Sequence, residues 1–184
     1  MDIIIYCTIT KDEIFAKKFC LFAVSNGSCQ ERNHFFEELS KYRKVDSCGK
    51  HMNNMGHPCP ETYTSSGYHD FIGQYKFMIC FENSSRENYL TEKLLNAYLG
   101  GTIPIYWGCP NIDDYVNRNA ILYLKPDHND QDIQDLIKKI RELDTDPIKY
   151  RQMYEKPLFT DGKIPDTFNM EKLQESVTQQ IHSK

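Results

Sequence analysis

The stretch YKFMICFENSSRENYLTEKLLNAYLGGTIPIYWG, residues 75–108, decides the fold of this 184-residue chain. It begins with a short apolar run of the strand type at 76–80, and residues 81–88 are polar and rich in turn formers. Residues 89–99 have helical spacing and end in a glycine pair, after which 102–107 returns as a second apolar run. The pattern predicts a strand, a polar loop, a helix and a second strand.

Such a unit directs its polar loop at the N-terminus of the following helix, at the edge where open α/β sheets bind ligands. Strands and helices also alternate in the flanking sequence, which is typical of a layered α/β protein. The sequence therefore predicts a single Rossmann-like α/β domain. The other expected strands are 19–25, 44–46 and 120–124, and the other expected helices are 32–42 and 131–143.

Several shorter segments also carry local signals. Asp130 is expected to cap the helix at 131–143, and Pro147 suits the first position of a further helix. The remaining expectations are a strand at 2–10, a charged turn or short helix at 11–18, a long loop at 48–67, a helical turn at 68–74 and a polar terminal helix at 170–184.

The central stretch also carries a family resemblance. FENSSRENYLTEK followed by NAYLGGTIPIYWG resembles the signature of the α-1,3-fucosyltransferases, most closely their bacterial members. A second patch agrees, with FAVSN at 22–26 and RNHFFEELSKYRKVDSCGK at 32–50. The family uses GDP-fucose and has the two-domain GT-B fold. The resemblance implies that residues 19–158 form its donor-binding half, flanked by an extension or first strand at 1–18 and a tail or helix at 159–184.

The resemblance implies roles for several polar residues. Arg32 and Lys93 would contact the donor phosphates, since each opens a helix where a cation and free backbone N–H groups both attract an anion. Glu92 would hold the ribose hydroxyls. Tyr89, four residues before Lys93 and so expected on the same helix face, would line the sugar-nucleotide pocket.

Two residues of the polar loop have alternative interpretations. Asn83 can reach a phosphate or a ribose with its amide, although Asx-type turns are common at such positions. Glu82 either lies near the fucose ring and its developing positive charge, or holds the loop by accepting backbone N–H bonds. The sequence does not choose between these two roles of Glu82.

The expected reaction is transfer of fucose, with inversion, to a hydroxyl of a GlcNAc-type acceptor. The catalytic base lies in the family's first domain, and no position here matches it, so a partner chain, a homodimer or a missing segment would supply the acceptor site. A binding module without activity, or a transferase with another nucleotide sugar, remains an alternative. No cofactor or metal is expected: Asp144-Thr145-Asp146 spells a metal-binding DxD, but Asp146-Pro147 is typical of a helix start.

Composition limits the partners and the compartment. The formal net charge of −4 gives no case for nucleic acid binding. Cys48 and Cys59 are positioned to pair across a loop, but without a signal peptide the reduced thiol is the expectation. Asn83-Ser84-Ser85 is a glycosylation sequon, and a glycan there would fill the donor pocket. We therefore expect a soluble cytoplasmic protein, or a Golgi-lumen enzyme if the chain is a fragment.

Overall fold

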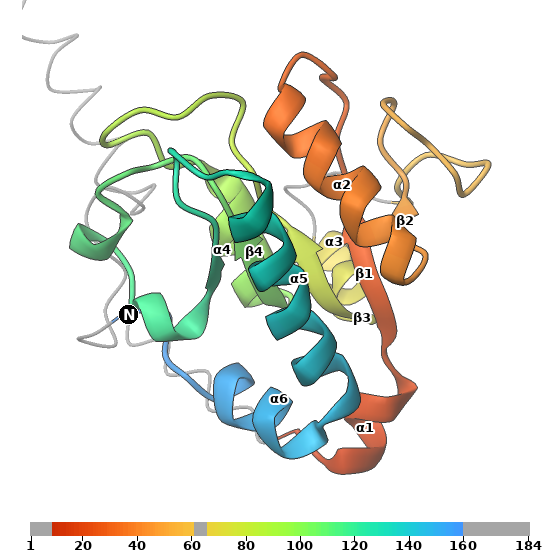
Figure 1. Cartoon of the computed structure of the whole chain (residues 1–184). Helices are drawn as coiled ribbons and strands as arrows, with labels where there is room; N and C mark the ends of the chain where they lie inside the picture. The colour runs from red at the N-terminus through yellow and green to blue at the C-terminus, as the bar shows by residue number, and fades with distance from the viewer. Residues whose placement is uncertain (1–8, 61–65, 160–184) are drawn as a thin grey trace, which may run out of the picture.

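The computed structural model describes residues 9–60 and 66–159, and within them the chain forms a parallel sheet in the order β2-β1-β3-β4-β5 (Figure 1). The strands are β1 Lys18–Phe22, β2 Asp46–Ser47, β3 Tyr75–Ile79, β4 Ile103–Tyr106 and β5 Leu122–Tyr123. The central strand is β3, in which every residue is buried. The expected α/β domain of the Rossmann-like kind is confirmed.

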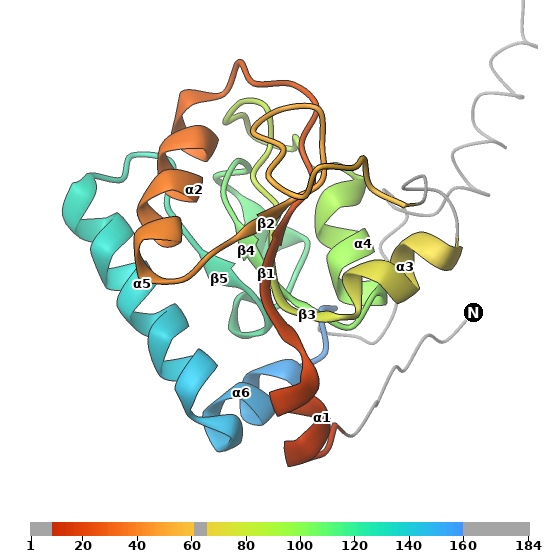
Figure 2. The same ribbon diagram turned by 90° about the vertical axis from the view of Figure 1, so that its right-hand side faces the viewer.

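Helices cover both faces of this sheet. Figure 2 shows α2 and α5 on one side and α3 and α4 on the other, with the strands seen between them. The α-helices are α1 Lys11–Ala16, α2 Gln30–Tyr42, α3 Ser66–Ile72, α4 Glu92–Leu99, α5 Asp130–Thr145 and α6 Pro147–Tyr154. Short 3₁₀ turns at Ile112–Asp114 and Arg118–Ala120 lead from β4 to β5.

Alternation along β3 divides the core into two layers. Phe77 and Ile79 pack in the cluster that holds the apolar faces of α2 and α5. Met78 belongs to the other cluster, together with Leu94 and Ala97 of α4. Because successive strand residues point to opposite faces, a short strand buried on both sides reads as a continuous apolar run. This explains why the sequence between 75 and 80 predicts a strand so clearly.

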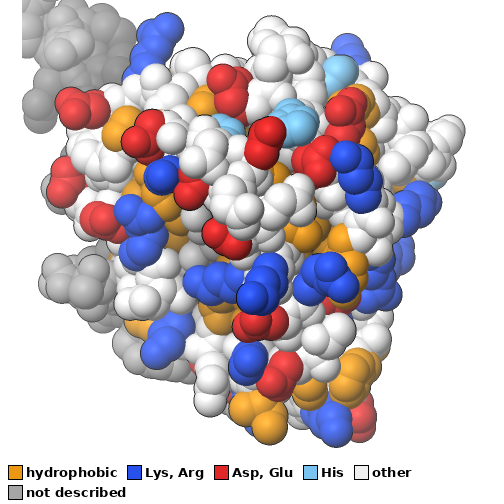
Figure 3. Space-filling model, in the orientation of Figure 1, with side chains coloured by type: hydrophobic (Ala, Val, Ile, Leu, Met, Phe, Trp, Pro, Cys, Tyr) orange, Lys and Arg blue, Asp and Glu red, His pale blue; other side chains and the backbone are white. Residues whose placement is uncertain are grey.

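Helix α5 shows the same division between an apolar and a charged face. Its expected apolar stripe is buried: Ile133, Leu136, Ile137, Ile140 and Leu143. On the opposite face, Figure 3 shows basic side chains gathered across the middle of the molecule, where Figure 1 shows α5, with acidic ones beside them. The helix begins one residue earlier than expected, since Asn129 and not Asp130 is the N-cap and forms a capping box with Asp132.

The central helix begins later than its sequence spacing predicts. Helix α4 starts at Glu92, so Tyr89 belongs to the preceding loop and does not share a helix face with Lys93. Asn88 explains the difference, because its φ of 59° lies in the left-handed region and interrupts any helix there. The polar loop after β3 therefore extends from residue 80 to residue 91, three residues further toward α4 than expected and one residue earlier at its start.

The expectation of reduced thiols at Cys48 and Cys59 is wrong, because the two residues form a disulfide. Backbone hydrogen bonds bring them together: Cys48 N donates to Phe22 O, and Cys59 N donates to Cys48 O. Cys20 and Cys80 are buried free thiols, as their apolar surroundings indicate. The strand expected at 2–10, apart from its last two residues, and the helix expected at 170–184 lie outside the described residues.

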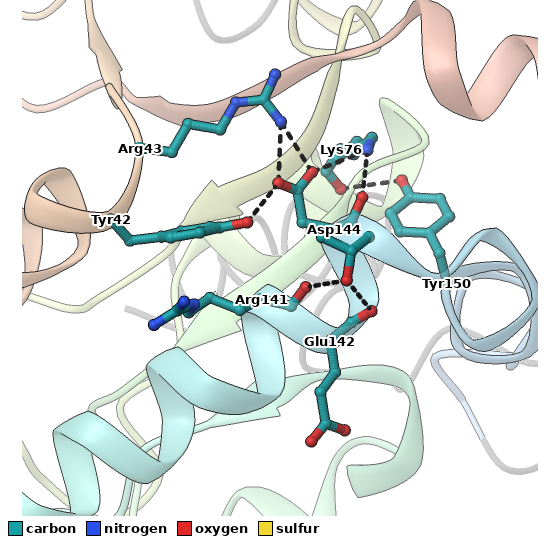
Figure 4. A network of polar contacts seen from close by, with 8 residues as sticks. Tyr42, Arg43, Lys76, Arg141, Glu142, Asp144 and Tyr150 are labelled. Carbon is teal, nitrogen blue, oxygen red and sulfur yellow. Dashed lines mark hydrogen bonds and ion pairs between the residues drawn. The ribbon is translucent and has the colours of Figure 1, made fainter.

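The two aspartates of the DxD triplet have structural partners. Asp144 is buried, and its carboxylate accepts hydrogen bonds from Lys76 Nζ at 2.8 Å, Arg43 Nη1 at 2.9 Å and Tyr42 Oη at 3.0 Å. Figure 4 shows these side chains converging on Asp144 from α2, β3 and the connection after α2. Asp146 caps α6 by accepting from Ile148 N and Lys149 N, with Pro147 at the first position.

We predict that Asp144→Ala lowers the free energy of unfolding by about 3–5 kcal/mol, because it leaves the buried Lys76 ammonium without its carboxylate. Burial raises the pKa of Asp144, but bonds from Lys76, Arg43 and Tyr42 lower it, and the net direction is downward. The carboxylate therefore stabilises the fold above the ordinary aspartate pKa, and this contribution is lost as pH falls through the lowered value.

Urea denaturation at pH 7 and at acidic pH measures both effects. The matched control is Glu142→Gln, which removes an exposed ion pair with Lys149 at 3.6 Å and should change stability by less than about 1 kcal/mol. An Asp144→Ala effect as small as that of the control would show that the buried network is not needed for stability.

Candidate functional site

The candidate site lies at the C-terminal edge of the sheet, where the loops after β1 and β3 meet. All five strands are parallel, so these loops emerge on the same side. Arg32 in α2 bridges them, because its Nη1 donates to Phe81 O at 3.2 Å and its Nη2 donates to Asn26 O. Figure 1 shows the start of α2 and the yellow-green loop after β3 on the same side of the sheet.

Arg32 also holds a residue of the polar loop. Its Nη1 donates to Asn83 Oδ1 at 2.9 Å, and the Arg32 side chain is 1% exposed. Burial lowers the pKa of the Arg32 guanidinium, while the nearby Cys29, Glu82 and Tyr89 raise it in part. The structure therefore places a buried positive charge directly beneath Asn83.

Glu82 joins the end of β3 to the start of α4. Its carboxylate is fully buried and accepts from Thr91 N at 2.9 Å and from Thr91 Oγ1 at 2.8 Å. Lys93 Nζ lies 3.3 Å from the same carboxylate. The sequence leaves two roles open for Glu82. These contacts fit the second role, in which Glu82 holds the loop by accepting a backbone N–H bond.

The N-terminus of α4 has an unusual cap. Thr91 occupies the N-cap position but makes no capping hydrogen bond to the helix, because its hydroxyl donates to Glu82 and accepts from Lys93 Nζ at 3.0 Å. The backbone N–H groups of the first turn are thus left without this side-chain partner, and the helix dipole places partial positive charge there. Lys93, with a side chain 24% exposed, adds a full positive charge.

The remaining predicted residues lie on or beside the same loop. Asn83 is exposed above Arg32, Tyr89 is half-buried, and Glu92 is the first residue of α4 with an exposed side chain. The predicted set of six residues is therefore within one region: Arg32, Glu82, Asn83, Tyr89, Glu92 and Lys93. A neighbouring cavity of about 620 Å³ is lined in part by Ser25, Lys50 and His57.

Sequence reasoning missed a second group at this edge, contributed by the segment after β4. Asn111 and Tyr115 bond to Asn88, and Ser85 Oγ donates to Gly108 O at 2.7 Å. The only available signal was position, because residues that follow the second strand of the unit must emerge at the same edge as the loop. Within residues 9–60 and 66–159, no group of three or more His, Cys, Asp or Glu side chains is arranged to hold a metal ion.

The sequence matches the family model described as "Glycosyltransferase family 10 (fucosyltransferase) C-term" over residues 15–161. Among curated proteins, it is 35% identical to the α-(1,3)-fucosyltransferase FucT of Helicobacter pylori, over 85% of this chain and 32% of that protein. It is 30% identical to GDP-fucose protein O-fucosyltransferase 3 of Xenopus laevis, over 94% of this chain and 36% of that protein. The chain thus spans about a third of the length of these relatives.

Solved structures show the same likeness. An α1,3-fucosyltransferase crystallised with GDP-fucose superposes with a TM-score of 0.74 at 29% identity, over 90% of this chain and 48% of the other. A structure of an α1,3-fucosyltransferase with GDP gives a TM-score of 0.69 at 30% identity, over 78% of this chain and 39% of the other. In the described part of this chain, no helix has the length and apolar character needed to cross a membrane.

Proposed function

Because this chain belongs to glycosyltransferase family 10, the fucosyltransferases, and corresponds to their C-terminal part, we propose that it binds GDP-fucose and takes part in fucosyl transfer. Residues 19–158 form the proposed donor-binding unit. The observation that carries the proposal is the start of α4, where a half-exposed loop, a helix N-terminus and the Lys93 ammonium face the same edge of the sheet. That arrangement attracts a diphosphate.

The proposed donor contacts follow from the positions of the side chains. Lys93 and the first-turn N–H groups of α4 bind the pyrophosphate, and Glu82 orients Lys93 from below. Arg32 is buried, so a direct contact with a phosphate requires the Asn83 side chain to turn away from it. Glu92, which is exposed, accepts from the ribose hydroxyls, and Tyr89 lines the pocket.

The proposed reaction replaces one bond at the anomeric carbon of fucose by another. An acceptor hydroxyl attacks this carbon, the bond to the β-phosphate oxygen breaks, and GDP leaves with the electron pair while a base takes the hydroxyl proton. Positive charge at Lys93, Arg32 and the α4 N-terminus offsets the charge that develops on the diphosphate. We assign the base and the acceptor site to a part of the enzyme other than these residues, on another domain or a partner chain.

Two acceptor classes are compatible with the relatives. A GlcNAc-type glycan is the first proposal, since relatives and solved structures include α-1,3-fucosyltransferases. A protein hydroxyl is the second, because the match to a protein O-fucosyltransferase covers 94% of this chain. The disulfide between Cys48 and Cys59 removes one reason for a cytoplasmic location and favours an oxidising compartment such as the Golgi lumen.

We predict that Lys93→Ala weakens GDP binding by roughly ten- to a hundredfold, because it removes a charge-assisted contact to the diphosphate. Isothermal titration calorimetry with GDP measures the effect on the full chain. Lys149→Ala is the matched control, since Lys149 lies in α6 with an exposed ion pair and should leave GDP affinity unchanged. Equal GDP affinities of Lys93→Ala and the unmodified protein would remove Lys93 from the site.

Turnover distinguishes a transferase from a binding module. GDP release from GDP-fucose is measured alone, with N-acetyllactosamine, and with a folded protein acceptor, each with and without EDTA. A transferase releases GDP faster with one acceptor, and we expect EDTA to leave that rate unchanged because cationic side chains bind the diphosphate. Tight GDP binding without stimulation by either acceptor would support the binding module, and a rate restored only by Mn²⁺ would contradict metal independence.

A further inference from the structure

An asparagine pair joins the loop after β3 to the segment after β4. Asn88 N donates to Asn111 Oδ1 at 2.9 Å, and Asn111 Nδ2 donates back to Asn88 Oδ1 at 2.9 Å. Tyr115 Oη donates to the same Asn88 oxygen at 2.6 Å, and Asn111 Nδ2 also donates to Asp114 Oδ2. The bonds between Asn88, Asn111 and Tyr115 form what we call the asparagine clamp.

The clamp holds Asn88, a residue with an unusual backbone conformation. Its φ of 59° is left-handed, a conformation that asparagine and glycine adopt more readily than other residues. The clamp uses both the backbone N–H and the side-chain oxygen of Asn88, so it holds the peptide between residues 87 and 88 and the side chain of the residue that directly precedes Tyr89. A residue without a polar side chain could not accept the hydrogen bonds that Asn111 and Tyr115 donate at this position.

The buried thiol of Cys109 lies beneath the clamp. Burial raises the pKa of the Cys109 thiol, and the nearby backbone of Asn88, Asn111 and Tyr89 offsets part of this effect. Cys109 Sγ also lies 3.1 Å from Asn111 Oδ1. Asn88 is therefore held against the segment after β4 through its backbone N–H and its side-chain oxygen, and Tyr89 follows directly from this anchored residue.

We propose that the asparagine clamp positions Tyr89 in the donor site, so that Asn88, Asn111 and Tyr115 contribute to donor affinity without touching the donor. This inference rests on the proposed function, in which Tyr89 lines the nucleotide-sugar pocket. Tyr89 is near enough to Arg32 to contribute to the pKa of that guanidinium, so the two residues belong to the same region. A loop that is already ordered loses less conformational entropy when the donor binds.

The test is a double-mutant cycle on GDP affinity by calorimetry. Asn88→Gly keeps the left-handed backbone accessible but removes the oxygen that Asn111 and Tyr115 need, and it should weaken GDP binding roughly five- to thirtyfold. In a Tyr89→Ala background the same change should have less than about a twofold effect, because the residue that the clamp positions is absent. Asn88→Asp, which keeps an oxygen acceptor, should bind GDP more tightly than Asn88→Gly.

Controls separate positioning from folding. Asn117→Gly removes bonds to Pro157 O and Asn119 N elsewhere on the surface and should leave GDP affinity unchanged. If Asn88→Gly lowers the melting temperature strongly, Tyr115→Phe, which deletes one hydroxyl of the clamp, replaces it in the cycle. An equal loss in both Tyr89 backgrounds, or an Asn88→Asp no better than Asn88→Gly, would overturn the inference.

The outcomes also distinguish this inference from the proposed function. If Tyr89→Ala alone leaves GDP affinity unchanged, the placement of Tyr89 in the donor site is wrong and the inference is overturned with it. If Tyr89→Ala weakens GDP binding and neither Asn88→Gly nor Tyr115→Phe does, the donor site stands and the clamp has no part in it.

Discussion

The buried carboxylate of Glu82 is the interaction on which the candidate site depends. A carboxylate that is removed from water needs hydrogen bonds or a cation, and Glu82 receives both from the start of α4. These bonds bring together the two ends of the polar loop and occupy the Thr91 hydroxyl that would otherwise cap the helix. One buried charge thereby orders the loop, orients Lys93 and leaves the helix N-terminus open to an anion.

The central strand β3 has buried charge near both ends, with different consequences. Lys76, near its start, pairs with Asp144, and this network closes the side of the sheet away from the site. Glu82 follows its C-terminal end and pairs with Lys93, which keeps a partly exposed ammonium. Both members of the Lys76–Asp144 pair are buried, whereas the Lys93 side chain remains 24% exposed. This difference is the physical basis for assigning binding to one edge and stability to the other.

The sequence predicted the strand–loop–helix–strand unit and the apolar stripe of α5 because burial imposes a period on each of them. It misplaced the start of α4, since Asn88 has a left-handed conformation and bonds to Asn111 and Tyr115, which are distant in sequence. Spacing alone could not reveal that backbone hydrogen bonds bring Cys48 and Cys59 together. In these bonds, Cys48 N donates to Phe22 O and Cys59 N donates to Cys48 O. The motif brought Arg32 and Asn83 into consideration, but only tertiary packing could show that the guanidinium is buried beneath the amide.

The most direct test of this account is a crystal structure of the chain with GDP bound. We predict that the diphosphate lies at the N-terminus of α4, within about 3 Å of Lys93 Nζ and of backbone N–H groups in the first helical turn. The bonds from Thr91 to Glu82 should remain as they are in the chain without nucleotide. GDP bound elsewhere on the molecule, or bound at this edge with Glu82 released from Thr91, would contradict the central claim.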